Sequence, residues 1–350
     1  MLVVVKKTTK NTTKENTTVI TTKTNSSSTK ANQSTQSGTT SIEEYEQGNV
    51  IKHDVIKDAR GNVLSVKSAY KEEGDTDFKY YARKESTYNA NNQETEVRHY
   101  IYDSEQNDWV MTFKFNYTYN AENKVDVQLE YHPKDNSQIR TTYEYANGKR
   151  VAYEYAKYNG SEFVNTTRYS TVYEGDNPKT NLTQKWDATT NSWINYRKDV
   201  NTYENDLEIS FITYDWNGEY WVKTAKGDIE YYEGTDKEKY YTYYQWNSST
   251  NTFDPYSKDY YDYDENGRRN LQIYHIYKDG VWEPSSKYES TYPYADVDTY
   301  QSISYDYNSE TGTWRKTSKF VAIVDKYYNW VKDTSYKWDT TTNDWAEVIN

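Results

Sequence analysis

The six residues Tyr277-Lys278-Asp279-Gly280-Val281-Trp282 decide the fold. Two large rings stand five residues apart, with Asp279-Gly280 midway between them. Gly and its short polar neighbours supply the positive φ angles that tight β-hairpin turns require. A two-residue turn places residues five apart directly opposite each other. The stretch therefore predicts two antiparallel strands in which Tyr277 faces Trp282.

The same spacing of rings recurs along the chain. A four-residue turn places residues seven apart directly opposite each other, so an insertion of two residues preserves a facing pair. A single inserted residue would turn a strand over. The facing pairs are predicted to be Tyr102/Trp109, Tyr158/Phe163, Trp186/Trp193, Trp216/Trp221, Trp246/Phe253, Tyr277/Trp282, Tyr307/Trp314 and Trp338/Trp345.

The bulky residue that follows each of these loops marks a period of roughly 30 residues. Its positions are Phe78, Trp109, Ile139, Phe163, Trp193, Trp221, Phe253, Trp282, Trp314 and Trp345. A second Gly- or Asn-containing loop, such as Glu265-Asn266-Gly267-Arg268, stands between successive positions. The intervening segments are rich in Tyr, Thr, Val and Ile, which favour strands. A period of this length is typical of repeat arrays.

We therefore predict an all-β protein: an antiparallel meander of about ten two-strand repeats, forming a solenoid-like body or an extended twisted sheet, over residues 42–350. Alternation within strands, as in Lys287–Tyr294, predicts that one face packs rings and the other is polar.

Composition agrees with a core built of rings. Aromatic residues make up 17% of the chain, with 42 Tyr and 11 Trp, and the net charge is -12. Few aliphatic residues and a high charge are usual in disordered chains, but each buried ring can remove roughly 150–250 Å² from water. Cysteine is absent, which excludes disulfides and thiolate chemistry. The acidic balance argues against nucleic acid and anionic membranes as partners, and no segment is long and apolar enough for a membrane span.

Residues 1–41 differ from the array. From residue 6 onward they are almost entirely Thr, Ser, Asn, Lys and Gln, so they bury little surface, and residues 1–41 are expected to be a disordered linker or stalk. The apolar run in Met1–Lys7 is too short for a signal-peptide core, so the route of export stays open.

The stretch Tyr263-Asp264-Glu265-Asn266-Gly267-Arg268 resembles the tyrosine-aspartate (YD or Rhs-type) repeats of bacterial surface and toxin proteins. The segment Ile276–Tyr288 is similar to Trp- and Tyr-rich repeats of secreted bacterial proteins. The resemblance spans the array from about residue 42 to 350, although Tyr203-Glu204-Asn205-Asp206 keeps only the outline of the motif. It implies β-hairpin repeats in an extracellular or cell-surface setting, and it brings no catalytic residue.

Catalytic and metal-binding patterns are not found. The four histidines, His53, His99, His132 and His275, show no ligand spacing. Asp262–Gly267 matches the first half of a calcium loop, but Ile273 stands where a bidentate Glu is needed, so a hairpin turn is the preferred interpretation. No acid–base carboxylate pair stands out. We expect no enzymatic activity, no cofactor and no metal.

The rings are the remaining candidate site. Exposed Trp and Tyr side chains stack on sugars and anchor protein partners. The candidate ligand-binding residues are Trp193, Trp221, Trp282, Trp314 and Trp345. One hypothesis is an adhesion or low-affinity binding scaffold for glycans or surface proteins. The alternative is a purely structural fibre, stalk or spacer, including a virus-particle fibre, in which the rings only join strands and copies can self-associate.

Overall fold

The computed structural model describes residues 38–46, 49–72, 74–292, 300–324 and 330–348. The linker predicted over residues 1–41 therefore lies outside the described residues except for its last four positions. Those four positions belong to the first strand, which begins at Gly38.

The described residues form 22 β-strands and no helix, which confirms the all-β prediction. The strands are β1 (Gly38–Glu46), β2 (Asn49–Lys57), β3 (Val63–Lys71), β4 (Lys79–Tyr88), β5 (Glu94–Asp103), β6 (Asp108–Tyr119), β7 (Val125–His132), β8 (Ser137–Ala146), β9 (Lys149–Tyr158), β10 (Phe163–Glu174), β11 (Asn177–Asp187), β12 (Ser192–Glu204), β13 (Leu207–Trp216), β14 (Trp221–Tyr231), β15 (Glu238–Asn247), β16 (Thr252–Tyr263), β17 (Arg269–Lys278), β18 (Val281–Thr291), β19 (Tyr300–Asn308), β20 (Thr313–Val324), β21 (Trp330–Asp339) and β22 (Asp344–Glu347).

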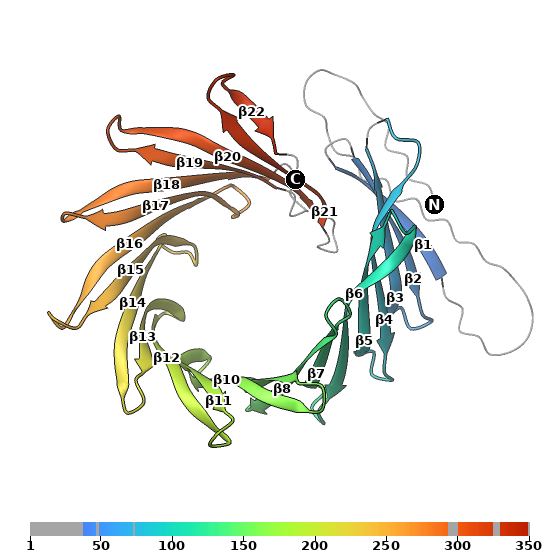
Figure 1. Ribbon diagram of the computed structural model, residues 1–350, viewed down its shortest axis with the longest axis horizontal. Helices are drawn as coiled ribbons and strands as arrows, with labels where there is room; N and C mark the ends of the chain where they lie inside the picture. The colour runs from blue at the N-terminus through green and yellow to red at the C-terminus, as the bar shows by residue number, and fades with distance from the viewer. Residues whose placement is uncertain (1–37, 47–48, 73, 293–299, 325–329, 349–350) are drawn as a thin grey trace, which may run out of the picture. The chain divides into compact units, whose positions relative to one another are not determined.

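The chain divides into two compact units. Unit 1 comprises the residues up to 143 together with 155–165, and unit 2 comprises 144–154 and 166–350. In unit 1 each strand from β1 to β8 pairs antiparallel with the next one in sequence. The same order holds from β10 to β22 in unit 2 (Figure 1). Each unit is thus a twisted antiparallel meander, as predicted.

The strand register confirms the predicted facing rings at seven hairpins. Trp216 pairs with Trp221 across a short turn, and Trp186 pairs with Trp193 across a four-residue turn. Ile139 is the exception. It pairs with Glu130, while Tyr131 faces Gln138, so the predicted anchor was wrong by one residue. Gln138 occupies the position that a ring takes in the other repeats, and a polar residue does not mark this position in the sequence.

The four-residue turns share one backbone feature. Their last residue has a positive φ, which is accessible to Gly and comparatively tolerated by Asn. These residues are Asn107, Asn136, Asn191, Asn251, Gly312 and Asn343, with φ from 51° to 67°. The Asn and Gly residues therefore mark hairpin ends rather than flexible linkers.

A β-bulge follows each ring anchor by three residues in seven of the hairpins. The extra residue is Tyr81, Thr112, Tyr196, Thr224, Tyr256, Ser285 or Thr317. One extra residue changes which face the following side chains occupy.

Both faces of the meander carry rings, unlike the single ring face predicted from alternation. In β13, Phe211 and Trp216 are five residues apart and so point to opposite faces. Phe211 stacks on Tyr241 of β15 with ring centroids 6.3 Å apart.

Most buried residues of the sheet are small or aliphatic, although Tyr261, Tyr305 and His53 are also buried. In unit 1 they include Ile51, Val55, Val66 and Val97, each at most 5% exposed. In unit 2 they are mostly small residues such as Ala225 and Thr242, which lie between larger rings. Gly227 shows why small residues are needed there: a Cβ atom at this position would lie 2.4 Å from the ring of Phe211.

Candidate functional site

The ring pairs lie at one end of the strands, where each odd-numbered strand turns into the next strand. Seven pairs have centroids 4.8–5.2 Å apart and meet edge to face. That arrangement matches the quadrupoles of the rings and adds about 0.5–1.5 kcal/mol per pair beyond burial. The eighth predicted pair, Tyr158 and Phe163, is tilted at 5.3 Å.

The structure places all five candidate tryptophans at equivalent positions, near the start of the strand after this turn. Trp193 lies in β12, Trp221 in β14, Trp282 in β18, Trp314 in β20 and Trp345 in β22. All five side chains are half-buried. Each ring therefore packs against its partner across the hairpin and still presents part of its surface to solvent.

Lysines from the preceding hairpin lie over several of these rings. The Nζ atom of Lys198 is 4.7 Å from the centroid of Trp221, and that of Lys287 is 5.4 Å from Trp314. Lys316 and Lys319 lie at 5.8 and 5.4 Å from Trp345. These distances fall within the range of cation–π attraction. The lysines therefore link one hairpin to the next through ring faces.

Trp193 and Trp282 differ from the other three candidates. Among the described residues, no cation lies over either ring, and each packs against the ring of its partner, Trp186 at 5.0 Å or Tyr277 at 4.9 Å. A ligand that stacks on either of these two rings therefore displaces no cation.

A polar cluster lies behind Trp314. The hydroxyl of Tyr305 donates a 2.6 Å hydrogen bond to Glu289, and Lys287 donates to the other carboxylate oxygen at 2.6 Å. Burial, together with the neighbouring carboxylate, raises the pKa of Tyr305 to about 12. Burial opposes the ionisation of Glu289, but the hydrogen bonds from Lys287 and Tyr305 outweigh it and lower the pKa of this carboxyl. This cluster binds neighbouring strands to each other.

The other end of the strands is organised by short polar loops. Asp58, Asn89, Asn120 and Asp264 each open such a loop, and the side-chain Oδ1 accepts hydrogen bonds from the backbone N–H groups two and four residues later, at 2.8–3.1 Å. Asp and Asn side chains commonly stabilise turns in this way, by accepting hydrogen bonds from nearby backbone N–H groups in place of a backbone carbonyl.

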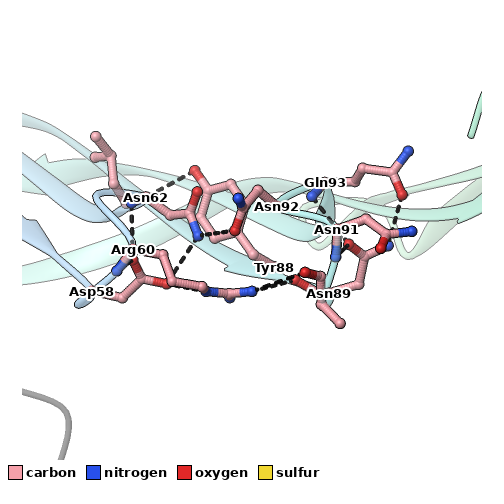
Figure 2. Close-up of polar contacts among 10 residues, drawn as sticks. Asp58, Arg60, Asn62, Tyr88, Asn89, Asn91, Asn92 and Gln93 are labelled. Carbon is pink, nitrogen blue, oxygen red and sulfur yellow. Dashed lines mark hydrogen bonds and ion pairs between the residues drawn. The ribbon is translucent and has the colours of Figure 1, made fainter.

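Neighbouring loops of unit 1 are joined to each other (Figure 2). Arg60 reaches across and donates to the carbonyl of Asn89 at 2.9 Å, and the amide of Asn62 donates to Asn92 at 3.0 Å. The next contact repeats the arrangement, because Asn91 and Gln93 donate to the side chain and carbonyl of Asn123. The loops therefore form a row of hydrogen-bonded turns.

A tyrosine at the end of a strand links this edge to the preceding repeat. Its hydroxyl donates to a backbone carbonyl 23 or 25 residues earlier. The six such bonds are Tyr88 to Val63, Tyr119 to Glu94, Tyr173 to Arg150, Tyr203 to Pro178, Tyr231 to Glu208 and Tyr292 to Arg269. Sequence reasoning missed this role. Four of the six tyrosines directly precede Asn or Glu, but Tyr231 precedes Tyr232 and Tyr292 precedes Pro293, so no common sequence signal marks the set.

The half-match to a calcium loop is a turn. Both carboxylate oxygens of Asp264 are engaged by Arg268, one through its backbone N–H at 2.8 Å and the other through its guanidinium at 2.9 Å. Within the described ranges, no group of three or more His, Cys, Asp or Glu side chains is arranged for a metal ion. His53 is buried with Nδ1 2.9 Å from Ser68, and His99 stacks on Phe113 at 4.3 Å.

One shallow depression lies at the β15–β16 hairpin. It has a volume of about 310 Å³ and is lined by residues that include Gln245, Asn247, Asp254 and Tyr256. A second depression of about 480 Å³ lies beside Lys149 and Tyr173 in unit 2. No helix among the described residues is long and apolar enough to span a membrane.

Comparisons with known proteins give only distant structural similarity. No family model matches the sequence, and no curated protein matches it. A DUF3836 family protein from Bacteroides vulgatus is 20% identical over 33% of this chain and 89% of its own, with a TM-score of 0.19. A protein of unknown function from Bacteroides fragilis is 16% identical over 56% and 99%, with a TM-score of 0.20. The TcdB2-TccC3-Cdc42 structure is 10% identical over 86% and 15%, with a TM-score of 0.39. With TM-scores below 0.5, these similarities identify neither a family nor an activity.

Proposed function

We propose that this chain is a non-enzymatic, extracellular or cell-surface repeat scaffold that binds glycan or protein ligands weakly at many ring sites. The observation that carries the proposal is the recurrence of half-exposed ring pairs at one hairpin position. Identical weak sites on one scaffold multiply their affinity when a ligand engages several of them. The likeness of Tyr263–Arg268 to YD-type repeats supports the bacterial surface setting.

Trp193 and Trp282 are the best candidates within this array, because no lysine among the described residues lies over either ring. Their ring faces can accept the apolar face of a sugar without displacing a cation. Trp221, Trp314 and Trp345 would first have to release the lysines that lie over them.

A glycan array followed by titration of the purified chain tests the proposal. We expect binding in the millimolar to high-micromolar range that weakens in Trp193→Ala and Trp282→Ala but much less in Trp221→Ala. Trp282→Phe keeps a ring against Tyr277, so it separates loss of the ligand contact from loss of the fold. Circular dichroism monitors the fold of each variant. Absence of binding to any glycan, and to proteins of the cell surface, would contradict the proposal.

A structural fibre or spacer is the second candidate, and the lysine-covered rings favour it. Each lysine over a ring uses the ring surface to join hairpins rather than to meet a ligand. Electron micrographs that show filaments or end-to-end assemblies of a chain that binds no ligand would support this function.

A further inference from the structure

At three of the seven bulges that follow a ring anchor, a threonine hydroxyl replaces the missing backbone hydrogen bond. Thr112, Thr224 and Thr317 occupy it in β6, β14 and β20, and each hydroxyl donates to the carbonyl of a residue on the facing strand, at 3.1, 3.3 and 3.1 Å. A bulge interrupts the ladder of backbone bonds, so this bond closes the gap. Threonine thus adds a stabilising hydrogen bond at this position, which tyrosine occupies equally often, at Tyr81, Tyr196 and Tyr256.

Tyr256 occupies the same position in β16. A tyrosine hydroxyl is too far from its own backbone to close the bulge in this way. Its ring is instead 47% exposed and is held on one side by Tyr243, edge to face at 6.0 Å. The chain therefore has an exposed ring here, oriented by Tyr243, whose open surface is available to a stacking ligand.

Polar groups that suit a sugar surround this ring. The depression at the β15–β16 hairpin brings together Gln245, Asn247, Asp254 and Tyr256. Asp254 is held in place because its Oδ2 accepts from the amide of Asn247 at 2.7 Å and its Oδ1 accepts from the hydroxyl of Thr252 at 2.9 Å. A carboxylate oxygen can accept two hydrogen bonds, so each keeps acceptor capacity for a ligand hydroxyl.

We propose that Tyr256 and Asp254 form a carbohydrate subsite for one neutral pyranose ring. The apolar face of the sugar stacks on Tyr256, and its hydroxyls donate to Asp254 and accept from the amides of Gln245 or Asn247. The depression of about 310 Å³ lies at the small end of ligand sites, which suits one ring rather than a long chain. Asp254 and the net charge of -12 disfavour acidic sugars.

Trp246 of the pair Trp246/Phe253 also lines this depression. The site includes none of the five candidate tryptophans and shares with the proposed function only the glycan class of ligand. A matched comparison lies at Tyr196, which occupies the equivalent bulge of β12 and is 49% exposed. There Ile194 stands in the place of Asp254, and the Nζ atom of Lys185 lies 5.1 Å from the centroid of the tyrosine ring. Tyr196 therefore has the ring without the carboxylate.

The test is an NMR titration of the full chain with methyl glycosides of glucose, galactose and mannose and with their short neutral oligomers. We expect at least one of these sugars to bind, and its dissociation constant to rise at least about tenfold in Tyr256→Thr and in Asp254→Asn. Tyr256→Thr installs the residue that the fold uses elsewhere, so we expect its melting temperature to be unchanged or higher. Tyr196→Thr should leave the dissociation constant unchanged.

The outcomes distinguish sugar binding at this site from sugar binding at Trp193 and Trp282. Sugar binding that is lost in Trp193→Ala or Trp282→Ala but unchanged in Tyr256→Thr would overturn the subsite and leave the proposed function intact. Loss in Tyr256→Thr with retention in both tryptophan variants would support the subsite and remove Trp193 and Trp282 as the sugar site. No response to any neutral sugar would overturn the subsite, and protein ligands would then still test the proposed function.

Discussion

The hydroxyl of Tyr119 donates a 2.6 Å hydrogen bond to the backbone carbonyl of Glu94, 25 residues earlier in the chain. Tyr119 ends β6 and Glu94 begins β5, so the bond connects the end of one repeat to the start of the strand before it. Five further tyrosines make the equivalent bond. The repeats are thus joined by side chains as well as by strand pairing.

Replacing Tyr119 with Phe removes this bond and leaves the ring in place. We expect the free energy of unfolding to fall by about 0.5–1.5 kcal/mol, the usual net value of a hydrogen bond in a protein. Tyr220→Phe is the control, because Tyr220 is 60% exposed. Urea denaturation measures both variants, and equal stability of the two would show that the bond contributes nothing.

Gly227→Ala tests the close packing in the middle of β14. The added methyl group would lie 2.4 Å from the Cε1 atom of Phe211, and overpacking of this kind costs about 1–3 kcal/mol. Phe211→Leu should relieve the clash, so the double variant should be less destabilised than the two single variants added together. If the losses of stability in the two single variants simply add in the double variant, the contact with Phe211 is not the reason that residue 227 is glycine.

Asn191 tests the left-handed turn residue. It is exposed, with φ at 51°. Asn191→Gly should be close to neutral, whereas Asn191→Val should cost at least about 1–2 kcal/mol because a left-handed conformation forces Cβ toward the following carbonyl oxygen. Thermal unfolding of the two variants makes the comparison. A valine variant as stable as the glycine variant would mean that the turn has another conformation in solution.

Alkaline pH should unfold the chain by ionising its buried tyrosines. Burial is the largest cause that raises the pKa of Tyr117, Tyr241, Tyr261 and Tyr305 to about 12, from an ordinary value of 10.0. Between these values the unfolded chain loses protons that the folded chain retains, so stability is complete below pH 10 and falls as the pH rises toward 12.

Unfolding free energies measured from pH 8 upward test this expectation. Glu289→Gln should lower the pH at which Tyr305 ionises, because it removes the neighbouring charge that favours the neutral phenol. Ultraviolet absorbance of the tyrosinate ion follows that step. A stability that does not change up to pH 12 would show that these phenols are not held neutral by the fold.

The sequence by itself determined the hairpins and the ring pairs. Facing residues such as Trp216 and Trp221 are set by the length of the turn between them, which is local, and insertions of two residues leave the facing pair intact. The prediction failed at Ile139, where the ring position is occupied by Gln138 and no bulky residue marks the register.

Only the tertiary structure decided how the repeats are joined and which faces the rings occupy. A bulge such as that at Thr224 adds one residue to one strand and changes the face of all the side chains beyond it, which alternation alone does not reveal. The tyrosine hydroxyls and the lysines over tryptophans, such as Lys198 over Trp221, reach partners in the neighbouring repeat. Contacts over such distances depend on strand twist and side-chain direction, which are properties of the folded sheet rather than of any short stretch of sequence.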